Sequence, residues 1–340
     1  MRVMDMNELL IGTYTGRSDS RGIYRAMLDD DGRFCESGLL AEARDPSYIA
    51  LDSAGGRLYA VDEQSGRGGV VSFARGAAGW ERTGQADSQG GAPCHLSISP
   101  EGDALAVANY EDGVVTLCAL RDGALTGETQ ALPGRTDAPG VGRQECSHAH
   151  MCTFAQGRLL VCDLGCDVVR AFERQDGRWR EVEPWLRLPA GAGPRHMAIG
   201  PTGAVYVLGE LDSRLHVFLP DGGAETLPLT PDDRAGALAP GQDNSGAGAI
   251  RLSPDGRRLL CTLRPQGLVC LLDVDAAGRA HYAGAFDCGG RNPRDAAFAG
   301  EYVVCACQDE GGLICLKPEK GGARVTDRLA LGAPVCVLSV

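Results

Sequence analysis

Histidine, arginine and carboxylate side chains follow short apolar segments in the middle of the chain. His148 and His150 belong to the segment QECSHAHM, Arg195 and His196 to GPRH, and Glu210 to GELD. An imidazole or a carboxylate can take a proton from water, and a guanidinium group presents paired donors that suit a phosphate or a carboxylate. These residue types therefore predict acid–base chemistry on an anionic small molecule.

Two further arginines occupy comparable settings. Arg264 ends the apolar run RLLCTLR much as Glu210 ends AVYVLGE, whereas Arg251 lies in AIRLSPDG, where the related segments carry small residues. An arginine in so narrow a place needs a partner, and a structural carboxylate meets that need as well as a ligand does. The histidines that recur at one position of these segments are open to the same two interpretations. His148 lies outside that position.

The segments that carry these residues recur along the chain. The common form is Pro, any residue, His or Tyr, then small and apolar residues and a turn, which some copies keep only in part, and the seven copies lie 41 to 55 residues apart. This spacing is typical of a β-propeller, in which ~40 to 50 residues build one four-stranded blade. Val- and Leu-rich runs between turns, which signal strands, follow the copies. The third positions of the copies are Tyr48, His95, His150, His196, Ala249, Asp295 and Cys336.

The seventh copy is followed by no further strand pattern before Val340, but matching runs stand at the other end, LLIGTYT at 9–15 and GIYRAML at 22–28. We therefore predict an all-β fold, a single seven-bladed β-propeller over residues 1–340 whose last blade is closed by both termini. Residues 335–340 are predicted to pair with residues 8–14, which removes the free sheet edges of an open array. The Gly- and Pro-rich stretches 133–147 and 230–248 are predicted to be loops.

The amino-acid composition limits the classes of molecule that this protein is expected to bind. The formal net charge of −12 disfavours nucleic acid and anionic membranes, and without a leader pattern or a long apolar run we expect a soluble, cytoplasmic protein. The 14 cysteines show neither metal-site nor secreted-disulfide spacing, so we expect buried, reduced thiols, and neither metal nor cofactor. The nucleophile elbow, the zinc-protease motif, the P-loop and the dinucleotide fingerprint are all missing from the sequence.

Taken together, the quoted segments resemble the lactonase family of seven-bladed propellers. The resemblance rests on GTYT with GIY, GGAPCHLSISPEG with LAVANYEDG, QECSHAHM with LLVCDLGCD, GPRHMAIGPTG with GELD, IRLSPDGRRLL, and NPRD, which stand in order over essentially the whole chain. That family includes bacterial 6-phosphogluconolactonases of the propeller type and fungal 3-carboxymuconate lactonising enzymes. The resemblance implies a propeller fold and an activity on a lactone.

The resemblance also implies a site of one histidine, two arginines and one glutamate. These fall on His148, Arg195, Arg264 and Glu210. One departure is that Thr-Leu precedes Arg264 where the family usually has Ser-Asn, so a polar contact beside this arginine is in question.

The expected reaction is metal-independent hydrolysis of 6-phosphogluconolactone in the pentose phosphate pathway, by a monomer or weak homodimer. Either Glu210 or His148 activates water, one arginine stabilises the oxyanion, and the remaining basic groups hold the phosphate. The residues expected to take part are Glu210, His148 and Arg264 in catalysis, and Arg195, His150, His196 and Arg251 in substrate binding.

Three alternatives remain open. A cycloisomerase acting on a carboxylated muconate would use the same arginines for carboxylates. A metal-dependent sugar lactonase would gather Glu63, Asp163 and Glu210 around Ca²⁺ or Zn²⁺, and EDTA would abolish its activity. A non-catalytic propeller would present binding loops and show no lactonase activity.

Overall fold

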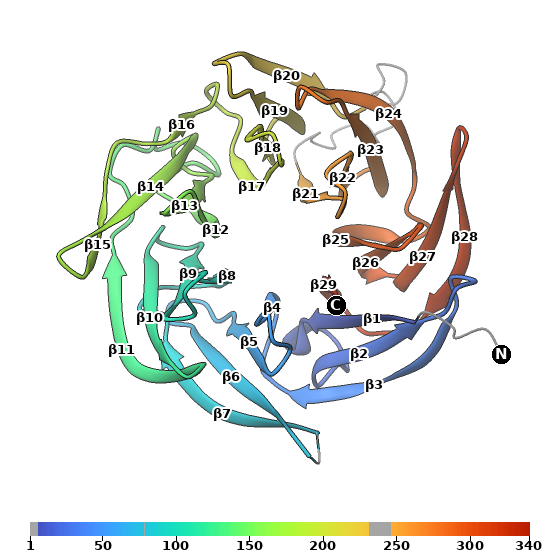
Figure 1. The fold of residues 1–340 in the computed structure, drawn as a ribbon, viewed down its shortest axis with the longest axis horizontal. Coiled ribbons are helices and arrows are strands. Elements are labelled where there is room, and N and C mark those ends of the chain that lie inside the picture. The colour runs from blue at the N-terminus through green and yellow to red at the C-terminus, as the bar shows by residue number, and fades with distance from the viewer. Residues whose placement is uncertain (1–5, 78, 231–245) are drawn as a thin grey trace.

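The computed structural model describes residues 6–77, 79–230 and 246–340. Seven antiparallel sheets surround a central axis (Figure 1), and each runs outward from a strand at the centre to a strand at the rim. The prediction of an all-β, seven-bladed propeller is confirmed. The innermost strands are β4 (Ile49–Leu51), β8 (Pro93–Ile98), β12 (Ala149–Ala155), β17 (Pro194–Ile199), β21 (Ala247–Leu252), β25 (Arg291–Ala299) and β29 (Pro334–Ser339).

The remaining strands form three concentric sets, and a short 3₁₀ turn, η1 (Thr15–Arg17), follows the first strand of the chain. The second strands are β1 (Asn7–Thr13), β5 (Arg57–Asp62), β9 (Ala104–Asn109), β13 (Arg158–Asp163), β18 (Val205–Gly209), β22 (Arg258–Leu263) and β26 (Tyr302–Glu310). The third strands are β2 (Gly22–Leu28), β6 (Gly69–Gly76), β10 (Val115–Arg121), β14 (Val168–Gln175), β19 (Arg214–Phe218), β23 (Leu268–Val274) and β27 (Gly312–Glu319). The outer strands are β3 (Phe34–Glu42), β7 (Gly79–Asp87), β11 (Ala124–Leu132), β15 (Arg178–Glu181) with β16 (Leu186–Arg187), β20 (Ala224–Pro228), β24 (Ala280–Asp287) and β28 (Gly322–Leu329).

The hydrophobic core lies between neighbouring blades. Leu208 and Val217 of one blade, for example, belong to the same buried cluster as Leu259 and Cys261 of the next. Burying one such leucine stabilises the fold by about 1.5–3 kcal/mol. Eleven of the fourteen thiols are buried and all fourteen are free, so most cysteines act as small apolar side chains of this core.

The two ends of the chain share one sheet, in the order β29-β1-β2-β3. Leu9 pairs with Ser339, and Gly12 pairs with Cys336, as the repeat pattern predicts. Gly12 is required here because a Cβ atom on it would lie 2.2 Å from the carbonyl oxygen of Pro46. The innermost position of the seventh blade is thus filled by the C-terminal strand.

Several of the innermost strands, which surround the central channel of the propeller, carry a β-bulge near their N-terminal end. In β17, Pro194 pairs with Gly209 and His196 with Leu208, so Arg195 is the extra residue of the bulge. A bulge redirects a side chain, and here it re-aims the residues at this end of the inner strands. The bulge residues that correspond to Arg195 are Cys94, His150 and Arg294.

This register corrects one part of the sequence alignment. His150 was expected to share the position of His95 and His196, but Ala149 pairs with Asp163 and Met151 with Cys162. The partner of His95 and His196 in this blade is therefore Met151, and His150 corresponds to Arg195. The similarity of HAHM to PRHM hid a shift of one residue.

Of the two predicted loops, residues 133–147 join β11 to β12 without a strand, apart from one bridge between Val141 and Gln144. The predicted loop 230–248 falls largely on 231–245, outside the described residues, and Ala247 already belongs to β21. No helical segment in the described part of the chain is long and apolar enough to cross a bilayer.

Candidate active site

The residues directly after the second strands face one another around one end of the channel in at least two pairs of neighbouring blades. Tyr14 after β1 donates a hydrogen bond to Glu63 after β5, and Arg264 after β22 donates one to Glu210 after β18. The repeat therefore gathers polar groups from different blades at one place. In six of the blades the residues at this position are Tyr14, Glu63, Tyr110, Leu164, Glu210 and Arg264.

Glu210 is the centre of the larger group and is 1% exposed. Its Oε1 accepts hydrogen bonds from Arg143 Nη1 at 2.6 Å and Arg264 Nη2 at 2.5 Å. Its Oε2 lies 3.0 Å from Arg195 Nε and 3.8 Å from His150 Nε2. Three guanidinium groups thus surround one carboxylate, and the structure brings together three of the four residues that the family resemblance implies.

This surrounding controls the charge of Glu210. Burial alone would raise the pKa of the carboxyl group, but the charges of Arg264 and Arg195, with smaller contributions from His150 and Arg143, hold it well below its usual range. Glu210 is therefore ionised at neutral pH and is a weak proton acceptor. Three positive charges against one negative charge leave this group with a surplus of two.

Arg195, the second arginine in contact with Glu210, is deeply buried, with 2% of its surface exposed. Its Nη1 donates to the carbonyl oxygen of Gly248 at 2.6 Å and lies 3.2 Å from a ring nitrogen of His196. Burial, followed by repulsion from Arg264, lowers the pKa of Arg195 to about 10. Arg195 stays charged at neutral pH, and its position ties the carboxylate to the next inner strand.

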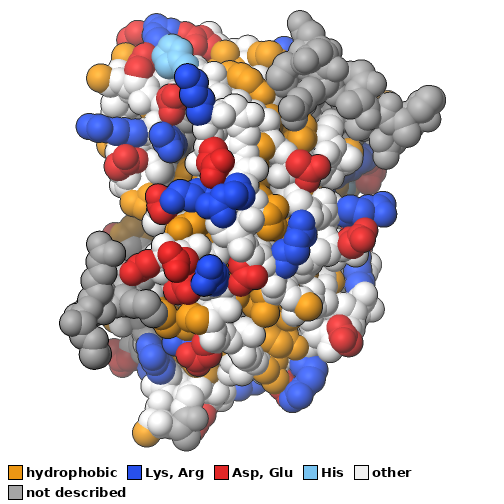
Figure 2. All heavy atoms as spheres, turned by 90° about the vertical axis from the view of Figure 1, so that its right-hand side faces the viewer, with side chains coloured by type: hydrophobic (Ala, Val, Ile, Leu, Met, Phe, Trp, Pro, Cys, Tyr) orange, Lys and Arg blue, Asp and Glu red, His pale blue; other side chains and the backbone are white. Residues whose placement is uncertain are grey.

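Arg143 and Arg264 line a cavity of 460 Å³. Its other lining residues are Gly246, the turn Pro265–Gly267, Asp287, residues 290–292 and Asp309. This volume lies within the range of about 300–1,000 Å³ that is usual for small-molecule sites. The cavity therefore has room for a small anion beside the two arginines. On the rim shown in Figure 2, by contrast, basic and acidic side chains are interspersed.

His148 does not contact Glu210 directly, and Tyr110 and Arg143 together connect the two. The Tyr110 ring stacks on His148 with centroids 4.5 Å apart, while its hydroxyl accepts a hydrogen bond from Arg143 at 3.0 Å. His148 Nδ1 lies 2.6 Å from the Tyr110 carbonyl oxygen and must donate to it. In the neutral imidazole the lone pair is therefore on Nε2.

The histidines at the centre of the channel form a buried, uncharged group. His196 lies 5.5 Å from His95 and 5.3 Å from His150, measured between ring centroids, and His95 stacks on Tyr48 at 3.9 Å. Burial, reinforced by nearby arginines, lowers the pKa of all three imidazoles well below the usual value. These rings pack the channel beneath the arginines.

Arg251 is engaged in a separate ion pair. Its Nη2 donates to Asp295 Oδ2 at 2.7 Å, and the same oxygen accepts the Val337 backbone N–H at 3.1 Å. Asp295 Oδ1 accepts the N–H of Ala296. The pair links β21, β25 and β29, so Arg251 has the structural carboxylate that was one of its two sequence interpretations.

Sequence reasoning missed Arg143, Tyr110 and Arg294. Arg143 lies in the loop 133–147, where no repeat position marks it, and only its place five residues before His148 could have drawn attention to it. Tyr110 has the same position after a second strand as Glu210, which the alignment could have shown. Arg294 is a bulge residue and donates to the Tyr14 hydroxyl at 2.9 Å.

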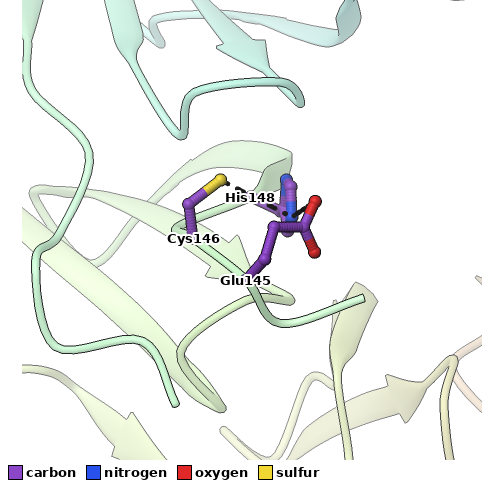
Figure 3. A group of neighbouring side chains, drawn as sticks. All are labelled: Glu145, Cys146 and His148. Atoms are coloured by element: carbon purple, nitrogen blue, oxygen red, sulfur yellow. Dashed lines mark hydrogen bonds and ion pairs between the residues drawn. The ribbon is translucent and has the colours of Figure 1, made fainter. Parts of the chain in front are cut away.

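The carboxylates Glu63, Asp163 and Glu210 do not form a metal-binding group within the described residues. One other group does bring possible ligands together there, namely Glu145, Cys146 and His148 (Figure 3). The arrangement required by the metal-dependent alternative is thus not found in that part of the chain.

Comparisons with known proteins identify the family of this chain. A sequence model of the family described as "Lactonase, 7-bladed beta-propeller" matches residues 8–339. The chain belongs to this family. The resemblance noted in the sequence is therefore confirmed, and the family supports a lactonase-type hydrolase.

Two relatives show what members of this lactonase family are called. The 6-phosphogluconolactonase of Bacillus subtilis is 28% identical over 346 residues, which cover 96% of both chains. The solved structure of the Pseudomonas aeruginosa periplasmic gluconolactonase has a TM-score of 0.87 and 26% identity, and it covers 99% of both chains. One of these names includes a phosphate and the other does not.

Proposed function

We propose that this lactonase-family protein hydrolyses 6-phosphogluconolactone. The observation that carries the proposal is the surplus of two positive charges around Glu210, next to a cavity of 460 Å³, in a chain with a net charge of −12. A local positive field inside an acidic protein attracts an anion to one place. A phosphorylated sugar lactone is such an anion, and the name of the Bacillus subtilis relative supports it.

Arg143 and Arg264 hold the phosphate in this proposal. Both line the cavity and both have a guanidinium group anchored by Glu210 Oε1, so the donors are fixed before the substrate arrives. Pre-positioned guanidinium groups lose little freedom on binding, and each charge-assisted hydrogen bond contributes about 1.5–3 kcal/mol. Glu210 then acts as a positioning residue.

His148 is the better general base in this arrangement. Its Nδ1 is fixed by the Tyr110 carbonyl oxygen, which leaves the Nε2 lone pair to take a proton from water. The water oxygen adds to the lactone carbonyl carbon, the ring carbon–oxygen bond breaks, and the ring oxygen leaves as a hydroxyl group after it takes up a proton. A positioned base and an arginine at the oxyanion contribute about 10²-fold each or more.

The test is the hydrolysis of freshly prepared 6-phosphogluconolactone, measured above the spontaneous rate, by wild type and three variants. His148→Gln is expected to lower kcat by about 10²-fold or more, because it removes the base. Arg143→Ala and Arg264→Ala are expected to raise KM by about 10- to 150-fold, the equivalent of one lost charge-assisted bond. His281→Gln and Arg258→Ala, two exposed residues outside this cluster and the cavity, serve as matched controls.

Unphosphorylated gluconolactone separates the two roles. His148→Gln should be harmful with both substrates, whereas the arginine variants should be nearly normal with a lactone that has no phosphate. If wild type prefers the unphosphorylated lactone, the phosphate assignment is wrong. If Glu210→Gln lowers kcat as much as His148→Gln does and leaves KM unchanged, the base is Glu210.

A further inference from the structure

The side chains of Glu145, Cys146 and His148 meet at the start of β12, and Figure 3 shows the three pointing toward one another. Their potential ligand atoms all lie within 4.8 Å of one another. His148 Nε2 is 3.4 Å from Glu145 Oε1 and 3.7 Å from Cys146 Sγ. The lactonase proposal uses His148 alone, so the carboxylate and the thiol beside it have no part in that chemistry.

The two separations from His148 Nε2 are close to those of zinc ligands. A tetrahedral Zn²⁺ holds sulfur at about 2.3 Å and nitrogen or oxygen at about 2.0–2.2 Å, which places the ligand atoms about 3.3–3.6 Å apart. The Nε2–Oε1 distance of 3.4 Å and the Nε2–Sγ distance of 3.7 Å are close to these values, and all three potential ligand atoms lie within 4.8 Å of one another. Three protein ligands leave a fourth position for water.

The histidine is already oriented as a ligand. Its Nδ1 donates to the Tyr110 carbonyl oxygen at 2.6 Å, and a backbone carbonyl at the second ring nitrogen is the usual support of a metal-binding imidazole. The backbone N–H of His148 donates to Asp163 Oδ1 at 2.9 Å, which fixes the loop next to the cysteine. The lone pair of Nε2 therefore points at the carboxylate and the thiol without a rearrangement.

One side of this group is open to solvent. Glu145 has an exposed side chain, which leaves a path for entry.

We propose that Glu145, Cys146 and His148 form a binding site for a thiophilic divalent cation such as Zn²⁺. On binding, Cys146 gives up its proton to solvent and the metal takes the Nε2 lone pair of His148. Occupancy of the site therefore withdraws His148 from proton transfer, a consequence that rests on the proposed function. The binding itself does not depend on it.

The test uses the full-length protein, reduced and treated with a chelator that is then removed, with Co²⁺ as the spectroscopic probe and Zn²⁺ as the competitor. One equivalent of Co²⁺ should give a thiolate-to-cobalt charge-transfer band and the visible bands of a tetrahedral site, and Zn²⁺ should abolish both. Cys146→Ser should remove the charge-transfer band, and Glu145→Ala should weaken binding by at least about 10- to 100-fold. Cys35→Ser, which removes the exposed thiol, should leave the spectrum unchanged.

Two spectroscopic results would overturn the site: no thiolate band in wild type, or the same band in Cys146→Ser. Glu145 is exposed, so its variant tests the site even if Cys146→Ser folds poorly. The activity assay is a separate measurement, in which stoichiometric Zn²⁺ should inhibit wild type and spare Glu145→Ala. If Co²⁺ binds through the thiolate but Zn²⁺ leaves hydrolysis unchanged, the metal site stands and His148 is not the base.

Discussion

Two buried carboxylates of this propeller, Glu210 and Asp295, have nearly the same exposure, 1% and 2%, but very different surroundings. Asp295 has one arginine and two backbone N–H groups as partners, which makes a neutral pair that joins three strands. Glu210 has three arginines, two of which also line a cavity. The first arrangement neutralises its charge within the fold, and the second leaves a positive surplus at an opening.

The difference shows how to distinguish structural from functional ion pairs. A buried carboxylate whose oxygens are satisfied by one cation and the backbone cross-links the structure. A carboxylate that holds more cations than it can neutralise keeps them in place for another anion. By this criterion Arg251, which pairs with Asp295, belongs to the fold, and Arg143 and Arg264 belong to the site.

The largest effect is expected from breaking the neutral pair. Asp295→Ala leaves Arg251 without its carboxylate partner and removes the acceptor of two backbone N–H groups, so the free energy of unfolding should fall by about 3–5 kcal/mol. Urea denaturation measures this loss. Asp273→Ala is the matched control, because its ion pair with Arg258 is exposed on both sides and should be worth about 0–1 kcal/mol. If Asp295→Ala lowers the free energy of unfolding by less than about 1 kcal/mol, the interpretation of the Arg251–Asp295 pair as a structural cross-link is wrong.

An intermediate effect is expected from adding an anion. Inorganic phosphate should raise the melting temperature of wild type, because a ligand at 100 times its Kd stabilises the folded state by about 2.7 kcal/mol. The double variant Arg143→Ala/Arg264→Ala should lose this response. Arg251→Ala should begin from a lower melting temperature but keep the response, since its arginine is not part of the surplus. If Arg251→Ala also abolishes the phosphate response, Arg251 is a ligand residue and the criterion is wrong.

Much of this comparison could be predicted from the sequence. The repeat spacing predicted seven blades and the closure by both termini, because turns and apolar runs are local signals. The family resemblance implied His148, Arg195, Glu210 and Arg264, and the last three lie in contact. The prediction reached these residues because each sits at the edge of a repeated strand.

The rest depends on features that the sequence pattern does not display. The bulge that turns Arg195 and His150 toward Glu210 inserts one residue on one strand only, so it changes the register without changing the motif. Arg143 comes from a loop outside the repeat, and its contact with Glu210 joins positions 67 residues apart. The contact of a loop residue such as Arg143 with Glu210 depends on the three-dimensional closure of the propeller, which the repeat period in the sequence does not describe.

The smallest effect is expected from the neutral, buried histidines His95 and His196. His95 accepts the Cys152 backbone N–H at Nδ1 and stacks on Tyr48, so a proton at Nδ1 would remove that hydrogen bond. Burial and the charges of Arg251 and Arg195 hold the pKa of His95 well below its usual value. Below a pH of about 6.5, the usual pKa of histidine, the imidazole therefore binds a proton in the unfolded chain but stays neutral in the folded chain.

The sign of the pH dependence follows from this difference. Stability from the neutral histidine is fully present above pH ~6.5 and is lost as the pH falls below it, by up to about 1.4 kcal/mol per pH unit for one such group. The free energy of unfolding of wild type should therefore fall between pH 6.5 and 5, and His95→Gln should have a shallower slope by up to one proton. His196→Gln should reduce the slope in the same way, because repulsion from Arg195 adds to its burial. Equal slopes for wild type and both variants would show that these rings are charged in the folded protein, and the positive surplus would then extend from Glu210 down the channel to Arg251.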